Sequence, residues 1–102
     1  MKSWIVYIIH CTDNTLYTGI TTDIERRYVQ HSMQQGAKYF RGRKPKKLVY
    51  QENGHDRSTA SKREIEIKKL SRVAKLQLIR SHSNNLADDS LESSFISRPE
   101  QN

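Results

Sequence analysis

Two short runs of strand-forming residues near the N-terminus, joined by a tight polar turn, constrain the fold more than any other feature. The runs lie within residues 2–11 and 15–20, and Asp13-Asn14 between them suits a short hairpin loop. The first run is apolar without alternation, which is typical of a strand that is covered on both faces. The sequence therefore predicts an antiparallel hairpin whose first strand is central in its sheet.

A helix is predicted to follow the hairpin. Thr22 and Glu25 have the spacing of a capping box, in which each side chain bonds to the backbone N–H group of the other residue. We expect this helix, with Thr22 as its N-cap, to run to about Gln35. Gly36 is expected to end it, because glycine readily takes the backbone conformation found after a helix.

The remaining pattern predicts one more strand and two more helices. Residues 47–52 alternate weakly and indicate a third strand that stops at the Asn53-Gly54 break. Residues 57–70 and 73–80 predict helices, with Ser71-Arg72 between them as a kink or a true break. The expected fold class is α/β, in finer terms α+β, with a three-stranded antiparallel sheet flanked by helices.

Size and composition narrow the class of protein. A chain of 102 residues suits one domain, and its hydrophobic share of 34% permits a small core. Cys11 is the single cysteine and cannot form an internal disulfide, and no charged leader followed by an apolar run opens the chain. No apolar stretch approaches the ~18 residues that would span a bilayer. We expect a cytoplasmic protein with no membrane partner.

Charge divides the chain into two parts. Residues 1–80 hold 17 Lys and Arg against 7 Asp and Glu, a balance of +10, whereas residues 81–102 hold 1 against 4, a balance of −3. A compact basic body is typical of proteins that bind nucleic acid. We assign residues 1–81 to a folded domain and residues 82–102 to an acidic, Ser-rich, disordered tail. The alternative for the tail is a segment that docks on a partner through its four apolar residues, Leu86, Leu91, Phe95 and Ile96.

Four polar side chains are predicted to converge on one patch. Tyr7 and Tyr17 fall on the two strands of the hairpin, where they can lie side by side. Arg27 and His31 are four residues apart in the first helix and therefore share one of its faces. A phenol pair, a guanidinium and an imidazole would then face a common point.

Glu64 is the acidic residue whose position most needs an explanation. It falls on the stripe formed by Ala60, Ile67 and Leu70, which should face the core. Burying an unpaired carboxylate is costly, and the usual solutions are an ion pair, a shifted pKa or a metal. The spacing alone leaves open a salt bridge from Glu64 to Arg27 or to a nearby lysine.

Together these residues resemble the GIY-YIG nuclease family, in particular its small single-domain bacterial branch (YhbQ-like), related to the nuclease domain of Slx-type structure-specific endonucleases. The resemblance covers about residues 3–80. Ile5-Val6-Tyr7 stands for the first motif and Tyr17-Thr18-Gly19 for the second, so that both tyrosines and the glycine are kept. Arg27 matches the catalytic arginine of the family, His31 the histidine or tyrosine one turn later, and Glu64 the metal-binding glutamate.

This resemblance implies an endonuclease that hydrolyses phosphodiester bonds in DNA with Mg²⁺ or Mn²⁺, with structure-specific action in DNA repair or recombination. Glu64 would hold one metal ion whose other ligands are waters and a phosphate oxygen. Arg27 would bind the same phosphate. Tyr17 would be the general base or would position the water, with Tyr7 beside it at the phosphate and His31 as a relay. A protein partner that supplies substrate specificity is also expected.

The role of Tyr17 as a base depends on its pKa. An unperturbed phenol has a pKa of ~10, so ionising it at pH 7 costs roughly 4 kcal/mol. Bound metal, Arg27 and the basic body would all lower this pKa. Some relatives carry a lysine directly after the second motif, where this chain has Ile20, so more of the task would fall to Arg27 and His31.

A single metal is expected, because two-metal sites usually need several acidic ligands. We interpret Asp13 and Asp56 as turn or cap residues, and leave the role of Glu52 open. The basic segment 38–47 is the predicted grip on DNA, through phosphate contacts from its six cations. These are Lys38, Arg41, Arg43, Lys44, Lys46 and Lys47.

The roles of several uncharged residues are left open between structure and DNA binding. Tyr39 and Phe40 either stack on an unpaired base or pack under the loop. Gly19 either bends its strand or lets DNA or the Arg27 helix approach closely. Trp4 is interpreted as a core residue.

Two other function classes also remain: a noncatalytic nucleic-acid-binding adaptor, and an RNA- or ribosome-associated basic protein. Metal dependence would separate the first from a nuclease, and preference for RNA the second.

Overall fold

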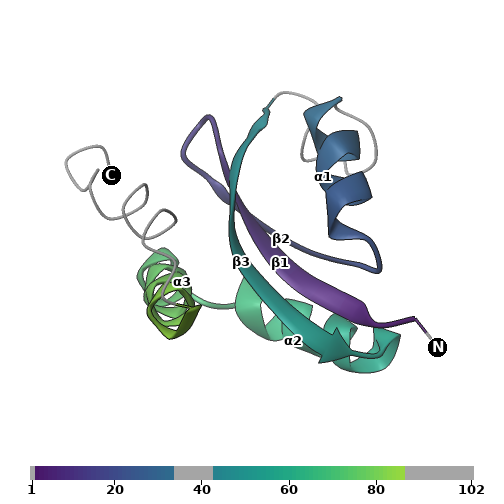
Figure 1. The fold of residues 1–102 in the computed structure, drawn as a ribbon. Coiled ribbons are helices and arrows are strands. Elements are labelled where there is room, and N and C mark those ends of the chain that lie inside the picture. The colour runs from purple at the N-terminus through teal and green to yellow at the C-terminus, as the bar shows by residue number, and fades with distance from the viewer. Residues whose placement is uncertain (1, 34–42, 87–102) are drawn as a thin grey trace.

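The computed structural model describes residues 2–33 and 43–86, which form a three-stranded antiparallel sheet with helices on both faces (Figure 1). The strands are β1 (Trp4–Cys11), β2 (Leu16–Thr21) and β3 (Pro45–His55), in the order β2-β1-β3. The predicted fold class, the hairpin and the central position of the first strand are confirmed. β2 is therefore an edge strand of the sheet.

The unbroken apolar run of β1 is explained by cores on both faces of the sheet. Val6 and Ile8 are buried on the face that is covered by the later helices. Tyr7 and Ile9 are buried on the opposite face. Burying a valine or isoleucine side chain is worth ~1.5–3 kcal/mol, so the central strand anchors both layers.

The hairpin turn forms as its polar residues predict. The Asp13 carboxylate accepts hydrogen bonds from the Thr15 hydroxyl at 2.6 Å and from the Thr15 N–H at 3.2 Å. Asn14 has a φ of 69°, in the left-handed region that asparagine tolerates better than most residues. This turn sets β2 against β1 so that Tyr7 lies opposite Gly19.

Helix α1 (Ile24–Ser32) is shorter than predicted and is capped differently. Asp23, not Thr22, is the N-cap, because its carboxylate accepts the N–H of Arg26 at 3.1 Å. Glu25 is therefore one position too early to complete a capping box. The helix ends at Ser32 rather than at Gln35, with Met33 as the C-cap, and the expected stop at Gly36 lies outside the described residues.

The Asn53-Gly54 pair does not end the third strand, as the sequence predicted, but lies inside it. The pairing with β1 shifts register between Val6 opposite Glu52 and Trp4 opposite His55. Such a shift is a bulge, and Gly54 accommodates it with a φ of 83°. β3 therefore continues to His55 instead of stopping at Glu52.

Helices α2 (Arg57–Lys68) and α3 (Arg72–Leu86) differ from prediction mainly at their ends. Asp56 caps α2 in a capping box with Thr59, which confirms its role as a cap residue. Ser71 forms a true break between the helices, since its hydroxyl accepts the N–H of Ala74 at 3.1 Å. α3 extends past the predicted end at Arg80 to Leu86, into the segment predicted as tail, while residues 87–102 lie outside the described part.

The helices are divided between the two faces of the sheet. α1 covers one face, and α2 and α3 lie on the other (Figure 1). Ala60, Ile67 and Ile79 complete the core beneath α2 and α3. Leu70 was predicted on the same stripe but is exposed, because α2 ends before it. Within the described ranges, no helix is long and apolar enough to cross a membrane.

Candidate active site

Tyr7 and Tyr17 lie on the same face of the sheet. Tyr7 is opposite Gly19 in the β1–β2 pair, and Tyr17 is two residues before Gly19, so both rings project toward α1. The ring centroids are 6.2 Å apart. The two strands thus bring together the phenols that the sequence predicted as neighbours.

Gly19 makes room for the Tyr7 ring. A Cβ atom at position 19 would lie 2.6 Å from Tyr7 Oη and 2.7 Å from Tyr7 Cζ, closer than real Cβ contacts. Neither predicted role for Gly19 describes this arrangement. The glycine is buried and faces the phenol of Tyr7, so it does not form part of a DNA-binding surface.

His31 connects α1 to both tyrosines. It is buried in the last turn of the helix, with Nε2 2.9 Å from Tyr7 Oη in a hydrogen bond. Its ring meets that of Tyr17 edge to face, with centroids 5.4 Å apart. The imidazole therefore holds both phenols against the helix.

Arg27 lies one turn before His31 and is half-buried. Its Nη1 donates a hydrogen bond to the Gln30 side-chain oxygen at 3.1 Å, which steadies the guanidinium on the helix surface. A hydrogen bond with Arg27 and the charge of Arg27 partly offset the rise that burial causes in the pKa of Tyr7, and the same charge partly offsets the rise for Tyr17. Arg27 is thus close to the phenol pair, on the side predicted from its spacing to His31.

Glu64 comes from α2, on the opposite face of the sheet. Its Oε2 atom forms an ion pair with Lys68 Nζ at 3.1 Å, and its side chain is 21% exposed. This is the nearby-lysine salt bridge that the sequence left open. The charge of Glu64 raises the pKa of both Tyr7 and Tyr17, so its effect reaches them past the edge strand β2.

Lys68 is the site residue that the sequence interpretation missed. It is four residues after Glu64 on the same helix, and an i, i+4 acid–base pair is the signal that would have identified it. Among the charges that lower the pKa of Tyr17, that of Lys68 has the largest effect, ahead of Arg27. Lys68 therefore supplies a cation beside Tyr17 in a chain that has Ile20 after its second motif.

The pKa of Tyr17 moves in the opposite direction to the one expected. Burial raises it and outweighs the lowering by Lys68 and Arg27. Burial also raises the pKa of Tyr7, further than that of Tyr17, with the neighbouring Tyr17 adding to the shift. In the protein alone, both phenols therefore keep their protons at neutral pH.

Exposure sorts the five predicted residues into two groups. Tyr7 and His31 have no exposed surface, so neither can contact a phosphate, which corrects the placement expected for Tyr7. Tyr17, Arg27 and Glu64 are each partly exposed and can meet a substrate. The buried pair can act only by positioning the other three.

The residues around Glu64 suit one hard cation that keeps most of its waters. In the part of the chain that the structure describes, no three His, Cys, Asp or Glu side chains are grouped so as to hold a metal. Mg²⁺ is often bound through one or two carboxylates together with substrate phosphates, so a dedicated cage is not required. Because Lys68 pairs with Oε2, Oε1 of Glu64 is the atom best placed to bind a metal.

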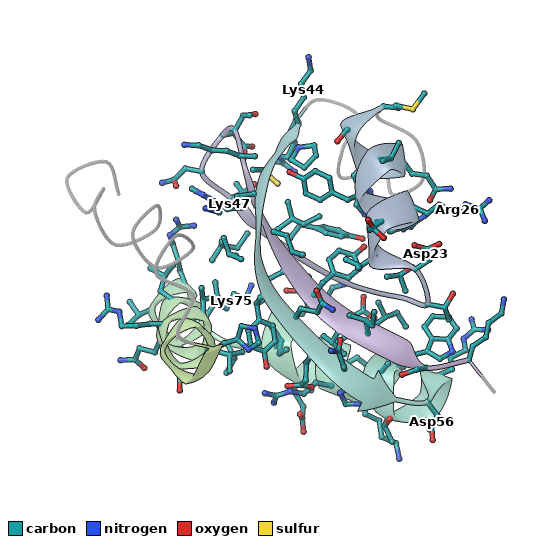
Figure 2. All side chains as sticks on the ribbon, viewed as in Figure 1. Asp23, Arg26, Lys44, Lys47, Asp56 and Lys75 are labelled. Carbon is teal, nitrogen blue, oxygen red and sulfur yellow. The ribbon has the colours of Figure 1, made fainter. Side chains whose placement is uncertain are left out.

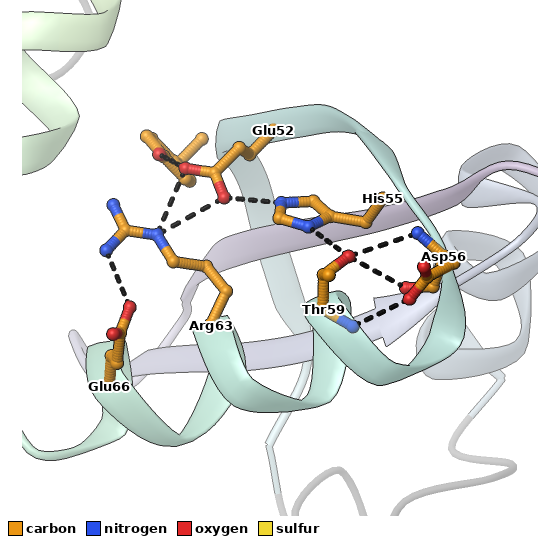
Figure 3. A network of polar contacts seen from close by, with 7 residues as sticks. Glu52, His55, Asp56, Thr59, Arg63 and Glu66 are labelled. Carbon is orange, nitrogen blue, oxygen red and sulfur yellow. Dashed lines mark hydrogen bonds and ion pairs between the residues drawn. The ribbon is translucent and has the colours of Figure 1, made fainter.

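Glu52, whose role the sequence left open, has a structural function (Figure 3). Its carboxylate accepts hydrogen bonds from Tyr50 Oη at 2.6 Å and His55 Nε2 at 2.7 Å, and forms an ion pair with Arg63 Nε at 3.1 Å. Arg63 also binds Glu66. These contacts connect β3 to α2 and leave Glu52 unsuited to a metal at the tyrosines.

The predicted DNA grip is only partly described. Lys38 and Arg41 lie outside the described residues, as do Tyr39 and Phe40. Arg43 forms an ion pair with Asp13 at 2.6 Å and so reinforces the hairpin turn. Lys44 and Lys46 are exposed and Lys47 is half-buried at the start of β3, where Lys44 projects away from the sheet (Figure 2).

Comparison with known proteins identifies the family to which this chain belongs. Residues 3–77 match the model of the GIY-YIG catalytic domain, so the chain belongs to the GIY-YIG family, whose members form a nuclease superfamily.

The relatives include small bacterial proteins. The UPF0213 protein DP2720 of Desulfotalea psychrophila is 54% identical over 79 residues, which cover 76% of this chain and 72% of that protein. UPF0213 protein SSP2268 of Staphylococcus saprophyticus is 51% identical over 79 residues, covering 78% and 96%. The solution NMR structure of EF2693 from E. faecalis has a TM-score of 0.56 at 37% identity, covering 79% of this chain and 86% of that one.

Proposed function

We propose that this protein is a metal-dependent endonuclease that hydrolyses phosphodiester bonds in DNA. The observation that carries the proposal is the arrangement at the β2 edge. The buried Tyr7–His31 hydrogen bond fixes Tyr17 from behind, while Arg27 from α1 and Glu64 from α2 act on the same phenol from opposite faces of the sheet. A fold that brings a cation, a phenol and a carboxylate to one accessible edge suits phosphoryl transfer, which depends on positioning and charge stabilisation.

Arg27 would bind a non-bridging oxygen of the scissile phosphate. Its guanidinium bonds to Gln30 and also interacts with Tyr7, which holds the planar fork next to the phenol pair, where it can also donate to a substrate. Charge on the phosphoryl oxygens grows toward the transition state, so this interaction would strengthen as the bond breaks. Arg27 is therefore assigned to charge stabilisation.

Tyr17 would orient the attacking water, and the phenolate would accept a proton from that water once the phenol has lost its own proton to solvent. The phenol is neutral in the free protein, so it begins as a hydrogen-bond partner of the water and not as a preformed base. Approach of a cation to Glu64 would offset the carboxylate charge that raises the pKa of Tyr17, while Lys68 and Arg27 continue to lower it. Substrate and metal binding would thus move Tyr17 toward the ionised form.

Glu64 would hold Mg²⁺ or Mn²⁺, which supplies Lewis-acid stabilisation of the phosphate and of the leaving oxygen. Lys68 keeps the Glu64 carboxylate oriented through its ion pair. Tyr7 and His31 are positioning residues, since they touch Tyr17 but not solvent. Action on branched or damaged DNA, in repair or recombination and with a partner protein that supplies specificity, is the wider role that we propose.

The test is cleavage of labelled single-stranded, duplex, flap and four-way-junction DNA, in Mg²⁺ and in EDTA. Glu64→Gln should reduce metal-dependent cutting at least 100-fold while DNA binding is kept. Glu66→Gln is the matched control, because Glu66 lies on the same helix and is exposed. Equal cutting by the wild type and Glu64→Gln would contradict the mechanism. Tight, salt-sensitive binding without cutting by any of the proteins would instead support the noncatalytic adaptor.

A further inference from the structure

A hollow of about 290 Å³ opens beside Arg27, at the end of the sheet where β1 begins and β2 ends. Strand residues Trp4 and Ile20 line one side of it, and Arg26, Arg27 and Gln30 of α1 line the other. Arg26 projects outward from α1 on this side of the molecule, close to Asp23 (Figure 2). Arg27 lines the hollow and is also a residue of the candidate active site, so the hollow is an extension of that site.

The wall formed by the strands is apolar and aromatic. Trp4 packs against the core beneath α2, as the sequence predicted, and it also lines the hollow. Ile20, which follows the second motif directly, lines the same wall. The guanidinium carbon of Arg57 is 5.6 Å from the indole centroid. Arg57 is not among the residues that line the hollow, so this contact does not occupy the space in which a ligand would lie.

The rim of the hollow is polar. The Thr21 hydroxyl at the end of β2 already donates to the Asp23 carbonyl and accepts the Asp23 N–H, so the Thr22 hydroxyl is the one offered to a ligand here. The Gln30 side-chain oxygen accepts from Arg27, so its NH₂ group is the half of the amide that can donate to a ligand. An apolar, aromatic wall with a polar rim matches a nucleobase, which has an apolar face and hydrogen-bonding edges.

The charges of the hollow suit the phosphate that accompanies a base. Arg26 is exposed at its mouth and Arg27 is half-buried inside it. Asp23 also lines the hollow, but its carboxylate accepts the backbone N–H of Arg26 as the helix cap. The hollow therefore has two positive charges, on Arg26 and Arg27, and one negative charge, on the Asp23 carboxylate that caps α1.

We propose that this hollow binds one unpaired nucleotide next to the bond that is cleaved, with the base against Trp4 and its phosphate between Arg26 and Arg27. Arg27 lines the hollow and also acts on Tyr17. The backbone that adjoins a base in the hollow would therefore run along Arg27 toward Tyr17. This assignment deepens the proposed function, since it names DNA with an unstacked nucleotide, as in a flap or junction, as the substrate.

Trp4 is the only tryptophan of the chain, so its fluorescence reports on the hollow. The probe is a short duplex with one unpaired thymidine, compared with the same duplex carrying an abasic residue at that position and with a fully paired duplex. Binding is followed by anisotropy of a label on the DNA, and stacking by tryptophan emission, both in EDTA so that no cutting occurs. The unpaired base should quench Trp4 and bind about 10-fold more tightly than the abasic duplex.

Two variants test whether Trp4 binds the base and Arg26 the phosphate. Trp4→Leu keeps apolar bulk under the core but removes the aromatic face, and it should abolish the preference for the unpaired base over the abasic residue. Arg26→Gln changes an exposed side chain and should weaken binding while lowering the salt slope by about one. Arg72→Gln, an exposed arginine at the start of α3, is the control and should change neither preference nor slope.

The outcomes separate this proposal from the nuclease activity. Quenching and base preference without metal-dependent cutting would support the hollow and reject the cleavage mechanism. Cutting with equal affinity for the three duplexes and unchanged Trp4 emission would overturn the hollow as a base site. Absence of DNA binding by the wild type would also overturn it.

Discussion

Tyr7 and His31 form a hydrogen bond in which Oη and Nε2 are 2.9 Å apart and neither side chain has any exposed surface. Removing one partner from such a bond leaves the other polar atom buried and unsatisfied, which costs ~1–3 kcal/mol. The pair also connects strand β1 to helix α1 across the face on which Tyr17 lies. Its role is therefore to fix the geometry of Tyr17.

Tyr7→Phe should lower the free energy of unfolding by ~1–3 kcal/mol, because His31 Nε2 then loses its partner in a buried environment. Urea denaturation measures the change. Tyr28→Phe is the matched control: Tyr28 packs on the same core, and no hydrogen bond of its hydroxyl is found among the described residues. Equal stability of Tyr7→Phe and the wild type would show that the bond does not hold α1 in place.

Gly19→Ala should destabilise the protein by ~1–3 kcal/mol through overpacking, since the added Cβ would meet Tyr7 Oη at 2.6 Å. Combining it with Tyr7→Leu removes both atoms that the new Cβ would meet, Oη and Cζ, so the two effects should be less than additive in a double-mutant cycle. Gly54→Ala offers a contrast: its cost would come from a φ of 83°, with nothing near the new atom. Additive effects at Tyr7 and Gly19 would argue against the steric account.

The hairpin, the central strand and the convergence of Tyr7, Tyr17 and His31 could all be predicted, because each depends on local spacing or on an unbroken apolar run. Exposure could not be predicted in the same way. Burial of Tyr7 and His31 depends on how closely α1 packs on the sheet, which involves residues distant in sequence. The sequence therefore placed Tyr7 at the phosphate, whereas the fold keeps it behind Tyr17.

Other differences have equally specific causes. Thr22 was predicted as the N-cap of α1, whereas Asp23 is the N-cap in the structure. Either side chain can cap a helix, so the sequence alone does not decide between them. The register shift at Gly54 depends on pairing with β1, so a glycine that appears to end a strand can lie inside one. Lys68 lies off the core stripe of α2, and only its i, i+4 spacing to Glu64 indicates its place in the site.

Glu52 should make stability depend on pH in the acidic range. Burial alone would raise its pKa, but hydrogen bonds from Tyr50 and His55 and the charge of Arg63 outweigh burial and lower it. A carboxyl whose pKa is lower in the folded state contributes stability above its unfolded pKa, ~4.3, and loses it as pH falls through the folded pKa. Wild-type stability should therefore decline below about pH 4.3.

Glu52→Gln should remove this acid-dependent component. At neutral pH the variant should be less stable by about 1 kcal/mol, a modest value because the network is partly exposed to solvent. The difference between the two proteins should shrink as pH falls below 4.3, since the wild-type carboxyl is then protonated as well. Urea denaturation at several pH values measures it, and a difference that stays constant down to pH 2.5 would rule out this account.

Lys68→Gln should raise the pKa of Tyr17 further, because the charge of Lys68 is the largest of those that lower it. NMR titration of ¹³C-labelled tyrosine, with Tyr17→Phe to assign the resonance, measures this shift without relying on catalysis. If the protein cleaves DNA as proposed, the limb of its pH–rate profile on which the rate rises with pH should move to higher pH in the same variant. Lys69→Gln, an exposed neighbour on the same segment, is the control and should leave the titration unchanged. An unaltered Tyr17 pKa in Lys68→Gln would mean that Lys68 serves only to orient Glu64.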